Sequence, residues 1–296
     1  MTLPVPPETA GAASARAGVA GRLGGLRSRS VSLQVGAAIV ALFVLAAIVS
    51  LFWTPYPPDA QATGAFSAPP DGEHWFGTDA TGADIFSRAL SAATIDVGIT
   101  LVVVALALVV GTVWGSLIGF YGGRLDGVSL RVLQIMNSFP SLLLAMLVLS
   151  TFGRGILPVI FVVALIPLPD YVRLSRAEIL TKKHWQFAEA ASMIGRRPRA
   201  VLFRHLVPNS TRPLLAYAAV NASWVLSTVG ALGFLGLGIE PGSAEWGSMI
   251  AGGQAGIVTG QWWISFFPGT CIFLLAAAFH LIGDGLSDDD LVRRGY

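Results

Sequence analysis

The sequence contains few charged residues for its length. Charged side chains make up 12% of the 296 residues, whereas 54% of the residues are hydrophobic. Typical soluble domains have about 25% charged residues. The composition therefore excludes an ordinary soluble protein and predicts a chain that crosses a membrane several times.

Cysteine is almost absent, and the net charge is only +2. The single cysteine, Cys271, lies in an apolar run, where contact with lipid or apolar side chains is favoured over a redox or metal-binding role. The small net charge gives no indication of nucleic-acid binding, and we expect no nucleic-acid partner.

The chain also lacks the signature of a nucleotide site. Its only lysines, Lys182 and Lys183, do not belong to a Gly-x-x-x-x-Gly-Lys-Ser/Thr sequence. The chain therefore cannot bind ATP through a P-loop. If transport by this protein is driven by ATP, another subunit must supply the ATPase.

Acidic residues and histidines are rare in the apolar segments. Asp96, Asp170, His280 and Asp284 are the exceptions, and each is expected toward the end of a span, where water or headgroups can solvate it. Secondary transporters driven by protons or sodium usually place such groups in the membrane interior. This class therefore remains the alternative rather than the first choice.

Motifs of intramembrane enzymes are missing as well. There is no Gly-x-Ser-x-Gly turn and no His-Glu-x-x-His pair, and His184 and His205 have no nucleophile near them in the sequence. The residues Glu73-His74, Asp79 and Asp84 form only a weak metal-binding pattern. We expect no catalytic residue, no cofactor site and no metal site on this chain.

Six apolar segments are expected to cross the membrane, because about 20 apolar residues span the hydrocarbon core as a helix. Pro140 should bend the third span, and Pro167 and Pro169 the fourth. Gly111, Gly115 and Gly119 recur every four residues in the second span, a spacing that favours close helix packing. The expected spans are residues 31–53, 94–121, 129–152, 156–175, 213–237 and 262–282. The prediction is an all-α membrane protein with six transmembrane helices.

The remaining segments complete the expected organisation. Residues 1–30 form a disordered basic leader, and 31–53 is a retained first span rather than a cleaved signal peptide, because its apolar run is too long. The other expected parts are an extracytoplasmic loop, 54–93, with a short amphipathic helix at 81–91; a five-helix core, 94–285; and a tail, 286–296. The connection 242–261 has a candidate short helix at 246–255, and its insertion into the membrane is left open.

The distribution of basic residues predicts the orientation, since Lys and Arg gather in cytoplasmic loops. With the N-terminus inside, four lie in the leader, two in the first inner loop, nine between 173 and 212, and two in the tail. Only Arg88 and Arg154 remain outside. Both termini and the central basic segment are therefore expected in the cytoplasm.

This basic segment, Arg173 to Arg212, is the longest polar stretch of the chain. Good helix formers surround Glu189-Ala190-Ala191, and Gly195 is placed to close a helix in the left-handed conformation. Pro198 suits the first turn of a second short helix, and Pro208 is expected to end it. Charge alone leaves two interpretations open, a topological anchor and a docking site.

The spacing within this segment is similar to a known motif. Glu189, Ala190 and Ala191, followed by three residues, Gly195, twelve residues and Pro208, resemble the EAA motif of the membrane subunits of bacterial ATP-binding-cassette importers. His205 and Val207 stand where that motif favours Ile and Leu. The resemblance implies a cytoplasmic coupling helix that docks into an ATPase subunit, within the loop 178–208. The implied coupling residues are Glu189, Ala190, Ala191, Gly195, His205 and Pro208.

Further motifs are similar to those of the permeases for dipeptides and oligopeptides. They include Gly77-Thr78-Asp79 through Ser87-Arg88, the Gly122–Asp126 turn, the Phe234-Leu235-Gly236 stretch and the 283–288 ending. The ordered set resembles the C-type membrane permease subunit of dipeptide and oligopeptide importers. Members of that family also carry nickel, heme or other small solutes, and these stay open as alternatives.

The resemblance also implies the surroundings of the chain. The expected partners are a second, homologous permease subunit, two ATP-binding-cassette ATPase subunits and an extracytoplasmic substrate-binding protein. ATP and Mg²⁺ would be held by the ATPase subunits, and the lipid bilayer would be the cytoplasmic (inner) membrane. The chain itself would be a translocation subunit and not an enzyme.

Overall fold

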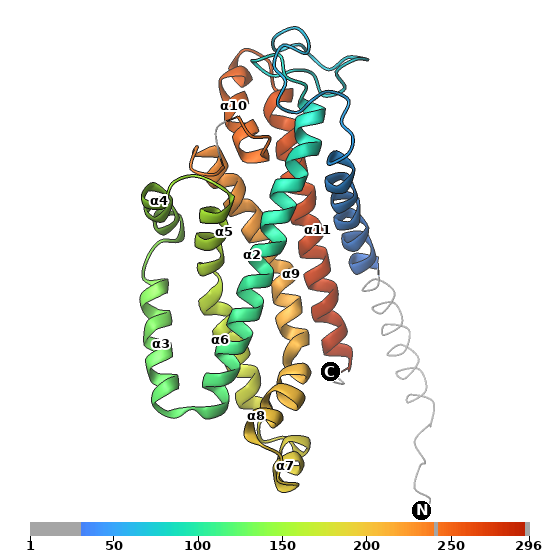
Figure 1. The fold of residues 1–296 in the computed structure, drawn as a ribbon. Coiled ribbons are helices and arrows are strands. Elements are labelled where there is room, and N and C mark those ends of the chain that lie inside the picture. The colour runs from blue at the N-terminus through green and yellow to red at the C-terminus, as the bar shows by residue number, and fades with distance from the viewer. Residues whose placement is uncertain (1–30, 240–241, 294–296) are drawn as a thin grey trace, which may run out of the picture.

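The computed structural model describes residues 31–239 and 242–293, which form an elongated bundle of helices (Figure 1). The leader 1–30 and residues 294–296 of the expected tail lie outside the described residues. The described helices are Val31–Ser50, α2 (Ile85–Tyr121), α3 (Gly123–Asn137), α4 (Ser141–Phe152), α5 (Ile156–Leu165), α6 (Leu168–Lys182), α7 (Gln186–Met193), α8 (Pro198–Val201), the π-helical turn η1 (Leu202–Leu206), α9 (Val207–Phe234), α10 (Trp246–Val258) and α11 (Trp263–Arg293).

Four of the described helical segments are long and apolar enough to cross a membrane, and two bent pairs bring the number to six. The predicted all-α membrane fold is therefore confirmed. The pair α3–α4 bends by 84° and the pair α5–α6 by 43°. Pro140 precedes α4 and Pro167 precedes α6, so each break falls at a proline that cannot continue the hydrogen-bond ladder.

The second helix differs from the expectation. A separate amphipathic helix at 81–91 was expected, but α2 runs without a break from Ile85 to Tyr121. Asp84 starts it, because its carboxylate accepts a 2.7 Å hydrogen bond from the Ser87 amide. The Ser91-Ala92-Ala93 stretch contains no residue that would end a helix, so the first turns and the span are one element.

The predicted close packing at the glycines of α2 is confirmed against α6. A Cβ added to Gly111 would collide with the Tyr171 side chain, and one added to Gly115 would collide with the Val172 carbonyl oxygen. The Ser116 and Ser175 hydroxyl groups form a 2.9 Å hydrogen bond in the same contact. Small residues thus let the two helices approach closely enough for backbone contact.

The bundle has two distinct ends (Figure 1). The loop between the first helix and α2 lies at one end together with α10, which packs against α9 and α11. The hairpin of α7 and α8 projects from the opposite end. The first helix, Val31–Ser50, lies along the outside of the bundle, with many of its apolar side chains exposed.

Candidate functional site

The helix α7 and the turn after it carry most of the residues suggested by the sequence motif. Its inner face is apolar: Ala188 and Ala191 are buried in a cluster with Leu202 and Leu206 of the following helical segment. Ile179 of α6 closes the cluster from the other side. The short helix is therefore held between α6 and η1 by apolar contacts.

The outer face of the same hairpin is exposed and partly apolar. Met193 is 85% exposed and Ile194 is 81% exposed, while Ala190 is also exposed. Exposed arginines follow at 196, 197 and 199. Large apolar side chains beside charges, on a projecting end of the molecule, are typical of a surface that binds another protein. The side chain of Glu189 lies outside the described residues.

Gly195 closes α7 in the way the sequence predicts. Its φ is +78°, and the Arg196 amide donates a 3.3 Å hydrogen bond to the Ala191 carbonyl oxygen. This is the Schellman arrangement, which satisfies a carbonyl group at the helix end. A Cβ at Gly195 would meet no atom within 4 Å, so glycine is needed here for its backbone conformation and not for space.

The expectation that Pro208 ends the second helix is wrong. Residues 198–234 form one continuous helical segment, and Pro208 lies in the first turn of α9. The π-helical turn explains this, because the Val207 amide donates to the Leu202 carbonyl oxygen, five residues back. The wider turn accommodates the missing donor of the proline. His205 lies in this turn, and its Nε2 atom is buried without a hydrogen-bond partner in the part of the chain that the structure describes.

Lys182 ties the hairpin to the bundle, a role that sequence reasoning missed. Its ammonium group is 2.6 Å from Glu178 Oε2 and 2.8 Å from the carbonyl oxygen of Asn209, and the residue is only 5% exposed. It therefore joins the end of α6 to the start of α9. The four-residue spacing of Glu178 and Lys182 on a helix was the available signal.

A second ion pair joins α6 to α3. The guanidinium group of Arg176 forms two hydrogen bonds of 2.5 Å with the carboxylate of Asp126. Helices α3 and α6 each belong to a bent pair. This contact therefore joins the first half of the α3–α4 pair to the second half of the α5–α6 pair. The bidentate geometry is the strongest form of such a pair.

At the other end of the molecule, the Gly77–Arg88 motif forms a structural clasp. Asp84 accepts from the Ser87 amide and lies 2.8 Å from Nδ1 of buried His74. The carbonyl oxygen of Thr78 accepts from the Trp263 indole, which joins the loop to α11. Arg88 donates to carbonyl groups of the loop, Pro58, and of the segment before α10, Gly242.

Three residues of the weak metal-binding pattern take part in contacts of this loop. His74 and Asp84 are paired with each other, and the Asp79 carboxylate accepts from the Thr81 and Ala83 amides. Within residues 31–239 and 242–293, no three His, Cys, Asp or Glu side chains are grouped to hold an ion.

The expectation that Asp96 lies at a solvated end of a span is wrong. The residue is 1% exposed, within α2, and its Oδ2 atom accepts a 3.0 Å hydrogen bond from the Trp246 amide at the start of α10. Helix α10 folds back over this end of the bundle and covers the carboxylate. The neighbouring Glu245, which sequence reasoning did not single out, caps α10 by accepting from the Gly247 and Ser248 amides.

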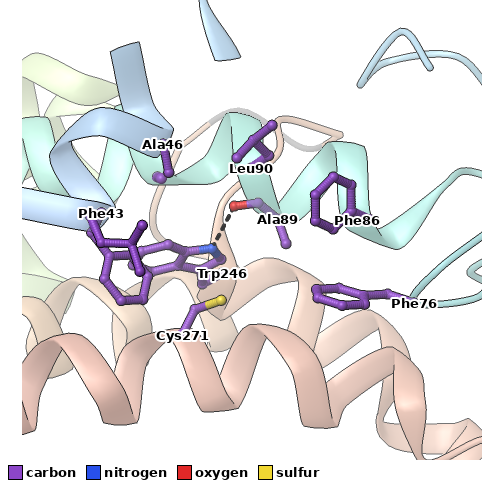
Figure 2. Close-up of a pocket in the computed structure, with 10 residues that line it drawn as sticks. Phe43, Ala46, Phe76, Phe86, Ala89, Leu90, Trp246 and Cys271 are labelled. Carbon is purple, nitrogen blue, oxygen red and sulfur yellow. Dashed lines mark hydrogen bonds between the residues drawn. The ribbon is translucent and has the colours of Figure 1, made fainter. Parts of the chain in front are cut away.

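Trp246 also forms the wall of an apolar pocket between the first helix, α2 and α11 (Figure 2). The pocket has a volume of about 180 Å³, and its labelled lining includes Phe43, Phe76 and Cys271. The indole nitrogen of Trp246 donates to the carbonyl oxygen of Ala89, another residue of the lining. Nothing in the lining is arranged to bind a polar solute.

Comparison with known proteins identifies the family. The chain matches the family described as binding-protein-dependent transport system inner membrane component over residues 111–288. It is 37% identical over 252 residues to a probable D,D-dipeptide transport system permease protein of Escherichia coli (strain K12), covering 85% of this chain and 84% of the relative.

Two further relatives also match over most of their length. The oligopeptide transport system permease protein of Bacillus subtilis (strain 168) is 33% identical over 266 residues, covering 89% of this chain and 86% of the relative. The nickel transport system permease protein of Escherichia coli (strain K12) is 34% identical over 257 residues, covering 87% and 92%. The chain therefore belongs to the family of inner membrane components of binding-protein-dependent transport systems.

Proposed function

We propose that this protein is the membrane-spanning permease subunit of an ATP-driven importer for dipeptides or oligopeptides, and that the α7 hairpin couples it to a separate ATPase. The observation that carries the proposal is the exposed apolar surface of Met193 and Ile194 on a helix whose opposite face is anchored in the bundle. Such a surface is what a docking element needs: one side rigidly held and one side open to a partner.

The anchoring contacts indicate how movement would be transmitted. Ala188 and Ala191 pack on Leu202 and Leu206, and Lys182 joins α6 to the start of α9. A displacement of α7 would therefore move α6 and α9 together. ATP binding and hydrolysis on the partner would drive this rigid-body change between inward- and outward-facing states.

The orientation follows from the same proposal. The hairpin, both termini and the Arg173–Arg212 segment would face the cytoplasm, where ATP is available, in agreement with the distribution of basic residues. The loop 54–84 and α10 would then face the extracytoplasmic side. A substrate-binding protein would deliver cargo there, and a second permease subunit and two ATPases holding ATP and Mg²⁺ would complete the complex.

Peptides are the proposed cargo because two of the relatives above are named for D,D-dipeptide and oligopeptide transport. Nickel is the alternative, because a third relative of similar identity is named for it. The chain has no P-loop of its own, so ATP hydrolysis would occur on the partner subunits.

The test is uptake by the complete complex reconstituted in vesicles with its ATPases and binding protein. We expect uptake of a radiolabelled dipeptide with Mg²⁺-ATP and none with a non-hydrolysable analogue. Ni²⁺ uptake measured in the same vesicles is the matched comparison. ATP-dependent uptake of Ni²⁺ but not of peptides would overturn the cargo proposal. Uptake that collapses with the proton gradient and continues without ATP would overturn the mechanism.

A further inference from the structure

A second pocket lies on a different side of α10 from the apolar one. It has a volume of about 360 Å³ and is formed by the α4–α5 turn, the end of α9 and the start of α10. Unlike the pocket in Figure 2, it contains side chains of both charges, Arg154 and Glu245. Its position, at the end opposite α7, is where cargo would first meet this subunit under the proposed function (Figure 1).

Arg154 is a cation with no ion-pair partner among residues 31–239 and 242–293. Its side chain is exposed, and it forms no hydrogen bond or ion pair with any described residue. It is also one of only two basic residues that the charge distribution leaves on the extracytoplasmic side. The other, Arg88, is committed to holding the loop through Pro58 and Gly242. No group in the described part of the chain therefore competes with an anionic ligand for the Arg154 guanidinium.

The carboxyl group of Glu245 has acceptor capacity to spare. Its oxygens accept 2.9 Å hydrogen bonds from the Gly247 and Ser248 amides, which leaves further lone pairs on a carboxylate. The residue is 2% exposed, and a Cβ at Gly233 would collide with its carboxylate, so the group is fixed in the pocket wall. Burial raises the pKa of Glu245, although the two backbone donors act in the opposite direction. A ligand cation would favour the charged form.

No ion pair joins these two groups, although they line one pocket. A cationic and an anionic side chain that do not neutralise each other are available to a ligand with both charges. A free dipeptide has this character, with an ammonium group at one terminus and a carboxylate at the other. Guanidinium groups bind carboxylates with two parallel hydrogen bonds, which makes Arg154 suited to the C-terminal group.

We propose that the pocket between the α4–α5 turn and α10 is a recognition site for the charged termini of a short peptide, with Arg154 binding the carboxylate and Glu245 the ammonium group. The inference rests on the proposed function, since it adds a specificity site to peptide import. A divalent cation fits the site poorly, because the guanidinium of Arg154 would repel it. The pocket thus favours the peptide alternative over nickel.

The test uses a reporter thiol in the pocket. Cys271 is the only cysteine of the chain, so an Ala251→Cys variant in a Cys271→Ala background has one thiol at the pocket wall. The rate of maleimide labelling is measured on the assembled complex, with and without Ala-Ala dipeptide. A Thr259→Cys variant, which places an exposed thiol after the end of α10, is the control for effects unrelated to the pocket.

We expect the free dipeptide to slow labelling of the Ala251→Cys variant and not of the Thr259→Cys variant. The N-acetylated dipeptide amide, which lacks both charges, should give no protection. Adding Arg154→Gln should raise the dipeptide concentration needed for protection about tenfold or more, as expected for loss of a hydrogen-bonded charge. Arg154→Lys should restore part of the effect, and the matched exposed change Arg124→Gln, in the first turn of α3, should have none.

Equal protection by the blocked peptide, or protection unchanged by Arg154→Gln, would overturn the inference. Uptake measured on the same complex separates the two proposals. ATP-dependent peptide uptake together with Arg154-independent protection leaves the proposed function standing and removes the site. Absence of peptide uptake by the unmodified complex removes the proposed function and, with it, the assignment of the pocket to peptide import.

Discussion

The two ends of the molecule use their polar residues in opposite ways. At the loop end, His74, Asp84 and Thr78 are buried. His74 is hydrogen-bonded to Asp84, and the carbonyl oxygen of Thr78 accepts from the Trp263 indole of α11. At the α7 end, the side chains after the helix are exposed, and Met193 and Ile194 point away from the bundle. The loop end therefore holds a fixed shape, whereas the α7 hairpin is held by the bundle on one side and leaves large apolar side chains exposed on the other.

This contrast changes how the sequence motifs are understood. The Gly77–Arg88 motif shapes a loop and starts α2, so its polar residues are structural. The Glu189–Gly195 motif also fixes a local shape, through Gly195, but the apolar side chains on its outer surface remain exposed. Only the second motif therefore has the properties of a docking element.

The largest effect is expected at the loop end. Asp84→Ala removes the cap of α2 and leaves buried His74 without its partner, which should cost about 3 kcal/mol of stability. The measurement is the midpoint of thermal unfolding in detergent. Asp59→Ala, in an exposed part of the same loop, is the control and should have little effect. Equal midpoints for the two variants would show that the loop is not a fixed clasp.

A smaller effect is expected at the anchor of the hairpin. Lys182→Met leaves Glu178 and the Asn209 carbonyl group without their shared cation, at a cost of about 2 kcal/mol, moderated because Glu178 is partly exposed. ATP hydrolysis should continue while peptide uptake falls, because α6 and α9 no longer move together. Lys183→Met is the neighbouring control. A variant that loses neither stability nor coupling would contradict the anchoring role.

Gly195→Ala should cost about 1 kcal/mol, because alanine is strained at a φ of +78°. The matched control is Gly252→Ala in α10, where a Cβ also meets no atom within 4 Å but the backbone does not have positive φ. That change should be neutral or slightly stabilising. Thermal midpoints distinguish the two, and equal shifts would contradict a conformational role for Gly195.

The smallest change in stability is expected for Met193→Asp, at about 0.5 kcal/mol or less, because the side chain is exposed. Its effect on function should nevertheless be large, since a charge would be placed in the proposed contact with the ATPase. Uptake per ATP hydrolysed is the quantity to measure. Unchanged coupling in this variant would remove Met193 from the docking surface.

The sequence was sufficient for the features that depend on local chemistry. The spans follow from apolar composition, the bend at Pro140 from its missing amide, and the closure at Gly195 from its freedom to adopt positive φ. The glycines of α2 were also correctly assigned to close packing. Each of these features is determined within a few residues along the chain.

Most of what the sequence did not predict depends on contacts between distant segments. Asp96 is buried because α10 folds over it, and no local pattern indicates that contact. Glu245 was missed for the same reason, since its pocket is completed by the α4–α5 turn. Pro208 did not end its helix, because a π-helical turn precedes it and removes the need for its amide. The first two outcomes are decided by tertiary packing, whereas the outcome at Pro208 is decided by the local backbone.

The central claim, that α7 is the docking element, is tested most directly by proximity. Met193→Cys and Val258→Cys, each in a Cys271→Ala chain, place single thiols at opposite ends on side chains that are 85% and 92% exposed. Each is labelled with a photoactivatable maleimide in the complex with its ATPases and illuminated. The account predicts cross-linking to the ATPase from position 193 and none from position 258. Cross-linking from 258, with none from 193, would contradict it.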